Sequence, residues 1–282
     1  IVEGNRQNFC PGATATKSVF CFDNRIIFLG TGIGNNSSFP TETTLYQFRL
    51  EDKNAAIDIN DEYTDAFPYS YRVTDRGQVV LTDTQKNIYI IKDGQGLVVE
   101  KKHQQSPLDT KKGNGEGDFV TAYLDHGVSP SQASYEYLML VSPTGKETSK
   151  YSKKLPYKVL QADNSAHVVK DEPTGTTAYI SYKGYSSDAT LVSSILPETI
   201  VMERTREDGT VVMSICTPDL GITKKGYTTS QASQPLERTV TLKGVYSLQG
   251  ENSSVQLTQA DGKTIVKATC INGIPVEFIL TK

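Results

Sequence analysis

The sequence lacks long apolar runs and has few cysteines. No stretch of its 282 residues approaches the roughly 20 apolar residues that a membrane-spanning helix needs, so no membrane span is expected. The four cysteines are too few for a disulfide framework and lack the Cys-x-x-Cys spacing of zinc sites. They are Cys10, Cys21, Cys216 and Cys270. We expect small buried thiols, and whether Cys216 pairs with Cys270 stays open.

An excess of charge of one sign is also absent. The formal net charge of -3 gives no general attraction to nucleic acids or anionic membranes, so no nucleic-acid partner is expected. A hydrophobic content of 37% and a charged content of 22% are typical of a globular protein with well-formed cores.

The chain has no initiator methionine, signal peptide or acylation motif, so we expect it to be a piece of a longer protein. Its first residues, Ile1 to Gly4, resemble the start of a mature trypsin-class protease. That class needs a serine, a histidine base and an aspartate. No Gly-Asp-Ser-Gly run exists, and none of the three histidines lies in an Ala-Ala-His-Cys setting, so the protease interpretation is set aside.

What the sequence does contain is a series of β-branched and tyrosine-rich runs separated by turn residues. SVFCF and RIIFLG flank the pair Asp23-Asn24, which tolerates positive φ and predicts a β-hairpin. Similar turn pairs stand at Arg76-Gly77, Asp208-Gly209 and Asp261-Gly262. Turns spaced by about ten residues are typical of β-sandwiches. We predict an all-β fold, with a large antiparallel sandwich followed by a smaller one.

A single segment favours a helix. Gly145 to Leu155 is rich in Lys, contains Glu147 and stops before Pro156. The break at Pro197 predicts a domain boundary, with a central sandwich over residues 1–197 and a C-terminal sandwich over residues 198–282.

Two segments begin like ligand-binding motifs and then depart from them. Asp58 to Asp65 has the acidic spacing of a calcium loop, but tyrosines replace its glycine and its final glutamate. Gly113 to Asp118 is glycine-rich, but no Lys-Ser/Thr pair follows and no strand-loop-helix context surrounds it. We predict a solvated loop at the first segment, no phosphate cradle at the second, and no metal ligands in this chain.

His126 has Asp125 beside it and Tyr135 and Tyr137 downstream, so a His–Tyr acid/base pair is conceivable. Neighbouring residues in a strand point to opposite faces, however, so adjacency does not place Asp125 on the imidazole. The favoured interpretation is a structural histidine at a strand end.

Several long motifs resemble those of polysaccharide lyase family 8. TKSVFCFDNRIIFLGTGI, TETTLYQ and EGDFVTAYLDHGVSPSQASYEYLML resemble its β-sandwich region. IVMERTREDGTVVMSICTPDLGIT and GIPVEFIL resemble its C-terminal β domain. The resemblance runs from about Phe9 to Lys282 and is strongest to the chondroitin sulfate ABC lyases. It implies a super-sandwich whose N-terminal part is truncated.

Members of this family cleave chondroitin, dermatan or hyaluronan chains by β-elimination at the uronate C5. The resemblance implies that the catalytic His, Tyr and Arg lie in a preceding helical toroid. It also implies that a Glu, or a Glu and an Asn, lies upstream of the strand beginning Lys17-Ser18. No catalytic residue is therefore expected in this chain, and all are expected upstream of Ile1. His126 and Tyr135 correspond to a structural sandwich motif. We expect a non-catalytic region that supports the helical domain and walls the cleft.

The resemblance also implies the partners. The parent enzyme would act on glycosaminoglycans outside the cell or in the periplasm. No cofactor is expected in this chain, while a divalent cation in the parent enzyme stays open. Because tryptophan is absent, sugar contacts must rest on Tyr, Phe or polar loop residues. The loop Gly32 to Thr41 offers Asn35 and Asn36 as substrate-binding candidates, against the simpler interpretation of a strand connection.

A rival interpretation is a stand-alone carbohydrate-binding or adhesive sandwich without an enzymatic parent. A row of exposed aromatic side chains on one sheet would favour it. A bare apolar face where a helical domain docks would favour the lyase.

Overall fold

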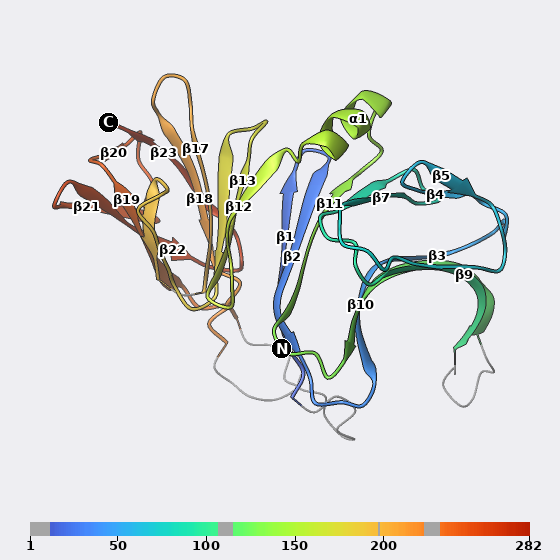
Figure 1. The fold of residues 1–282 in the computed structure, drawn as a ribbon. Helices are drawn as coiled ribbons and strands as arrows, with labels where there is room; N and C mark the ends of the chain where they lie inside the picture. Colours follow the sequence, from blue (N-terminus) through green and yellow to red (C-terminus); the bar gives the residue numbers. More distant parts are fainter. Residues whose placement is uncertain (1–11, 107–114, 197, 223–231) are drawn as a thin grey trace. The chain divides into compact units, whose positions relative to one another are not determined.

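The computed structural model describes residues 12–106, 115–196, 198–222 and 232–282. This part contains 23 strands and one helix, so the predicted all-β fold is confirmed (Figure 1). The chain divides into two compact units, residues 1–155 and 156–282. Each is described by itself.

Two sheets make up the first unit. The strands are β1 (Thr14–Phe22), β2 (Arg25–Gly34), β3 (Pro40–Arg49), β4 (Ile57–Ile59), β5 (Glu62–Thr64), β6 (Tyr69–Arg72), β7 (Val79–Thr82), β8 (Ile88–Ile91), β9 (Leu97–Ser106), β10 (Gly115–Val128) and β11 (Ala133–Leu140). One sheet has the order β1-β2-β11-β8-β7-β4-β5 and the other the order β3-β10-β9-β6. All pairings are antiparallel. Figure 1 shows β1, β2 and β11 side by side.

The hairpin predicted around Asp23-Asn24 is confirmed. β1 and β2 pair antiparallel, and Asp23 takes a φ of +52° at the turn. Four apolar side chains of this hairpin are buried. They are Phe20, Phe22, Ile27 and Leu29.

The core of the first unit lies between its two sheets and is rich in aromatic rings. Phe28 stacks on Tyr137 at 4.5 Å between ring centroids, and Tyr46 packs on Tyr89 at 5.1 Å. Such offset and tilted pairs contribute about 0.5–1.5 kcal/mol each beyond their area burial.

Helix α1 (Gly145–Lys153) closes the first unit and confirms the helix prediction to within two residues. Thr144 caps it. The Thr144 hydroxyl accepts from the Glu147 N–H, and the Glu147 carboxylate accepts from the Thr144 N–H, which forms a capping box.

The second unit is a sandwich. Its strands are β12 (Tyr157–Ala162), β13 (Ala166–Asp171), β14 (Thr176–Ser181), β15 (Tyr185–Ser186), β16 (Val192–Ile195), β17 (Thr199–Thr205), β18 (Val211–Cys216), β19 (Leu236–Lys243), β20 (Ser247–Leu248), β21 (Val255–Ala260), β22 (Lys263–Cys270) and β23 (Val276–Thr281). One sheet has the order β12-β13-β14-β17-β18-β23-β20 and the other the order β15-β16-β19-β22-β21. The core between them draws on both sheets.

The division between the units falls after Leu155, whereas the sequence predicted a boundary at Pro197. The reason is strand pairing across that proline. β14 pairs with β17, for example through Thr177 and Glu203, so residues on both sides of Pro197 share one sheet. The predicted boundary lies inside the second unit.

Candidate functional site

A polar hollow of about 250 Å³ lies at one end of the first unit. It is formed where the segment after β2 meets the turn between β10 and β11. Its lining residues are small or polar: Gly12, Thr14, Gly34, Asn35, Asn36, Ser129, Pro130, Ser131 and Gln132. Two hydrogen bonds join the segments, from Asn35 N–H to the Pro130 carbonyl at 3.3 Å and from Ser129 Oγ to the Ser37 carbonyl at 2.7 Å. The hollow therefore has a fixed frame.

Both substrate-binding candidates, Asn35 and Asn36, line this hollow, but their side chains have different roles. Asn35 is buried; its Oδ1 accepts from the Ser37 N–H at 2.7 Å, and its Nδ2 donates to the Thr41 hydroxyl. Asn35 thus holds the loop in shape. Asn36 is exposed, and its amide lies against Gly12, where an added Cβ would stand 2.6 Å from Nδ2. Of the two, Asn36 is the side chain that a ligand can reach.

The same loop carries an aromatic residue that the sequence analysis did not single out. Phe39 is 68% exposed, and its N–H donates to the Ser37 hydroxyl at 3.0 Å. Phe39 does not line the hollow, but its exposed ring stands three residues after Asn36 in the same loop. The signal was its place next to Pro40 in a loop between two strands.

His126 lies in a packed cluster. Its Nε2 hydrogen-bonds the Thr43 hydroxyl at 2.9 Å, and its ring stacks on Tyr135 at 6.4 Å between centroids. Lys17 Nζ lies 5.8 Å from the centre of the Tyr135 ring. Burial, followed by the charge of Lys17, lowers the pKa of His126. A neutral imidazole engaged with a threonine fits the structural role.

Asp125 is bonded to groups other than that imidazole. It accepts from the Gly127 N–H at 2.8 Å and from Arg72 at 2.9 Å. The Gly127 N–H is the main reason that the pKa of Asp125 lies below its usual value, and Arg72 adds to it. The carboxylate is therefore ionised and paired with Arg72, and does not orient His126.

The first motif-like segment is not the solvated loop that the sequence predicted, and part of the second lies outside the described residues. Asp58 to Thr64 is a tight hairpin, whose turn residues Asn60 and Asp61 have φ of +55° and +67°. Asn60 Oδ1 accepts from the Val80 N–H at 2.8 Å, so this side chain is used within the fold. Gly113 and Asn114 lie outside the described residues, and Gly115 opens β10.

The described residues include no group of three or more His, Cys, Asp or Glu side chains placed to hold a metal ion. Cys21, Cys216 and Cys270 are free thiols, and Cys10 lies outside the described part. Across the described ranges, no helix has the length and apolar character to cross a membrane.

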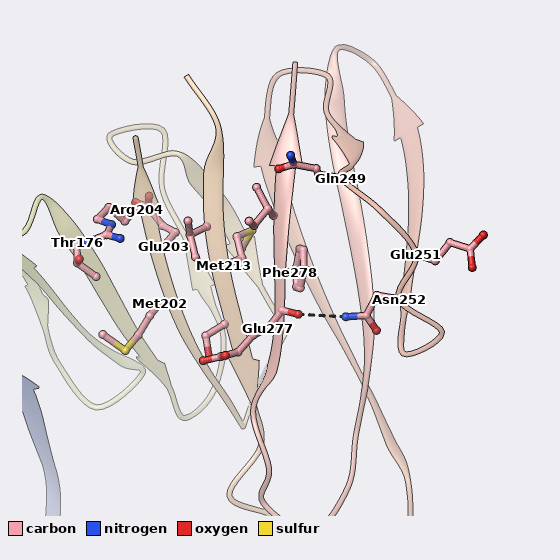
Figure 2. A pocket seen from close by; sticks show the side chains of 13 residues that line it. Thr176, Met202, Glu203, Arg204, Met213, Gln249, Glu251, Asn252, Glu277 and Phe278 are labelled. Carbon is pink, nitrogen blue, oxygen red and sulfur yellow. Dashed lines mark hydrogen bonds between the residues drawn. The ribbon is translucent and has the colours of Figure 1, made fainter. Parts of the chain in front are cut away.

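A second hollow, of about 510 Å³, lies in the second unit on the face of the sheet turned away from its core (Figure 2). It spans β14, β17, β18 and β23 and the segment that follows β20. Figure 2 shows Arg204 and Met202 on one side, Glu277 in the middle, and Gln249 and Asn252 on the other side. No sequence motif marked this site, because its residues come from five separate segments.

Comparison with known proteins gives the class. The family model "Polysaccharide lyase family 8, super-sandwich domain" matches residues 4–152, which is more than half of the chain. The chain belongs to polysaccharide lyase family 8. The resemblance seen in the sequence is confirmed.

Particular relatives match most or all of its length. The chain is 29% identical over 287 residues to a chondroitin sulfate ABC endolyase of Proteus vulgaris, a match that covers 100% of this chain and 27% of the relative. It is 30% identical over 257 residues to a chondroitin sulfate ABC exolyase of the same organism, covering 83% of this chain and 25% of the relative. The chain thus spans about a quarter of the length of these relatives.

Solved structures show the same fold. A Paenibacillus xanthan lyase superposes with a TM-score of 0.76 at 18% identity, covering 96% of this chain and 26% of that one. A chondroitinase AC lyase superposes with a TM-score of 0.70 at 20% identity, covering 96% and 37%. The fold class is therefore shared with polysaccharide lyases.

Proposed function

We propose that this chain is the C-terminal β region of a lyase that cleaves chondroitin or dermatan sulfate by β-elimination at the uronate C5. The observation that carries the proposal is the match of the entire chain to about a quarter of a chondroitin sulfate ABC endolyase. On this proposal the parent enzyme meets its polymeric substrate outside the cell or in the periplasm. A helical domain supplied by the rest of the parent would carry the catalytic residues.

The β region itself would be non-catalytic. Elimination requires a base for the C5 proton and groups that neutralise the uronate carboxylate. Among the described residues, His126 is the histidine with a tyrosine ring stacked on it, but its Nε2 already faces the Thr43 hydroxyl. Asp125 is committed to Arg72 and the Gly127 N–H. This arrangement favours support of the fold over proton transfer.

The proposed contribution to substrate is a saccharide contact at the polar hollow of the first unit. Asn36 offers an exposed amide, and Phe39 an exposed ring three residues further on. The geometry suits a cleft wall, in which the amide hydrogen-bonds sugar hydroxyls and the ring covers an apolar sugar face. Asn35 would only hold the loop, since both ends of its side chain are bonded within it.

Titration of the chain with a chondroitin sulfate hexasaccharide, followed by calorimetry, tests this contact. Asn36→Ala and Phe39→Ala should each weaken binding, by about five-fold or more for one lost hydrogen bond or ring contact. Asn54→Ala is the matched control, because Asn54 is an exposed amide elsewhere in the same unit. Equal affinities for all three variants and the unchanged chain would refute the contact.

The rival interpretation, a stand-alone carbohydrate-binding module, finds less support. The most exposed aromatic side chains of the described part are Phe39, Tyr63 and Tyr71. Phe39 lies in a loop, while Tyr63 is on β5 and Tyr71 on β6, which belong to different sheets. These three side chains therefore do not form a row on one sheet that could bind a polysaccharide by stacking on its sugar rings.

A further inference from the structure

The hollow of the second unit has the volume of a small-molecule site. Its 510 Å³ falls within the 300–1,000 Å³ that is usual for ligand pockets. Because strand residues alternate between faces, the buried Glu203, Met213 and Phe278 turn toward the core and only border the hollow. Their neighbours in each strand supply its inner surface.

The floor is aliphatic. Strand register places Arg204, Val212 and Ile279 in one row across β17, β18 and β23. The next row on the same face holds Met202 and Ser214, followed by Glu277. Met202, Val212 and Ile279 are half-buried side chains, which gives the floor an apolar surface between polar ends.

One wall of the hollow is held in place by its own hydrogen bonds. Asn252 Nδ2 donates to the Glu277 carbonyl at 3.1 Å, and its Oδ1 accepts from the Ser254 N–H at 3.0 Å. The Gln249 N–H donates to the Ile279 carbonyl at 2.9 Å. Figure 2 shows the Asn252 bond as a dashed line and Glu251 turned away on the far side of it. The wall therefore needs no rearrangement to receive a ligand.

The remaining polar side chains are not used by the fold. Within the described part of the chain, the side chains of Arg204, Ser214, Gln249 and Glu277 make no hydrogen bond or ion pair. Arg204 stands on β17 and Glu277 on β23, two strand spacings across the sheet and two residues along the strands, or about 12 Å apart. Opposite charges at this separation do not neutralise each other, so each remains available to a ligand.

We propose that this hollow binds a uronate–hexosamine disaccharide, with Arg204 holding the uronate carboxylate. A guanidinium is the side chain best shaped for a carboxylate. Glu277 and Gln249 then accept and donate to hydroxyls and the amide of the hexosamine. Met202 and Val212 cover the apolar face of the sugar and its acetyl methyl group.

Two features favour this ligand. The length between Arg204 and Glu277 matches two sugar rings. A longer ligand of several disulfated units is disfavoured, because its negative charges would be repelled by Glu277. The choice of a uronate-containing sugar rests on the proposed function; the spacing of cation, apolar floor and carboxylate stands independently of it.

Methionine-methyl NMR tests the proposal directly. The chain has three methionines, of which Met202 lies on the floor, Met213 points into the core and Met139 is in the other unit. The probe is the unsulfated, unsaturated chondroitin disaccharide. The Met202 methyl signal should shift in a saturable way during titration, while the signals of Met139 and Met213 stay in place.

Two arginine variants provide the matched pair. Arg204→Ala should raise the dissociation constant about ten-fold or more, as expected for a lost charge-assisted hydrogen bond. Arg206→Ala removes an exposed arginine two positions further along the chain, outside the hollow, and should leave the dissociation constant unchanged. N,N′-diacetylchitobiose, which has the same size and no carboxylate, should bind at least ten-fold more weakly to the unchanged protein.

The proposal is overturned if the Met202 signal stays in place at millimolar disaccharide, or if both arginine variants lose affinity equally. Equal binding of the neutral disaccharide would overturn the role of Arg204. Failure of the proposed function would look different. The Asn36 variant would then bind the hexasaccharide normally, while the Met202 response to the disaccharide persisted.

Discussion

Replacing Gly30 by alanine should disrupt the packing beneath the His126 cluster. Gly30 lies within β2, opposite Tyr135 of β11, and the ring of that tyrosine covers it. A Cβ at Gly30 would stand 2.1 Å from Tyr135 Cε1 and 2.6 Å from Cδ1. Carbon atoms pack at about 3.5–4.0 Å, so the ring would have to move by more than 1 Å.

The ring is not free to make that movement. Its centroid lies 5.8 Å from Tyr137 and 6.4 Å from His126, with Lys17 Nζ at 5.8 Å. Displacing it would loosen all three contacts. Overpacking of a well-packed site destabilises by about 1–3 kcal/mol, and we expect Gly30→Ala to reach the upper part of that range.

Urea unfolding followed by circular dichroism provides the measurement. In the Gly30→Ala background, Tyr135→Ala should be less harmful than in the unchanged protein, with a coupling of about 1–3 kcal/mol in a double-mutant cycle. Gly145→Ala is the control, since it lies at the start of α1 with nothing within 4 Å of an added Cβ. A Gly30→Ala variant as stable as this control would refute the packing argument.

Two further predictions concern stability. Phe22→Ala should lower the free energy of unfolding by about 3–5 kcal/mol, because the ring is only 5% exposed. Val19→Ala, on the opposite and half-exposed face of the strand, should change the free energy of unfolding by less than about 1 kcal/mol. Similar effects of the two variants in denaturant titrations would show that the inward face is misassigned. Burial raises the pKa of Glu203, so its contribution is fully present below its unfolded pKa and is lost as pH rises through the folded pKa. Glu203→Gln should therefore raise Tm relative to the unchanged protein at pH 8 but not at pH 4, and an equal effect at both pH values would contradict a buried ionisable group.

The strands and hairpins could be predicted because their signals are local. Asp23-Asn24 between two apolar runs specifies a hairpin without reference to the rest of the chain. The unit boundary could not be predicted in this way, because Thr177 pairs with Glu203, a residue 26 positions further along the chain and beyond Pro197. Nor does sequence pattern reveal that Lys101 is buried with its ammonium donating to the Ala55 and Asp65 carbonyls at 2.9 and 3.0 Å.

The candidate sites show the same limit. The composition of the loop containing Asn35 and Asn36 indicated a candidate binding site. Only the hydrogen-bond geometry shows that the Asn35 amide is bonded within the loop, whereas the Asn36 amide can be reached by a ligand. Phe39 is distinguished from the other residues of this loop by the exposure of its ring, which the sequence does not reveal. The hollow around Arg204 depends on strand register across a sheet, which adjacent residues in the sequence do not encode.

The central proposal is that this chain carries the fold of a polysaccharide lyase without its elimination chemistry. Its most direct test is to incubate the purified chain with dermatan sulfate and follow the ultraviolet absorbance of the unsaturated uronate product. The account predicts no product above the level of a buffer blank. Turnover that survives rigorous purification and disappears in His126→Ala would contradict it, because His126 would then be acting as a base rather than packing against Thr43 and Tyr135.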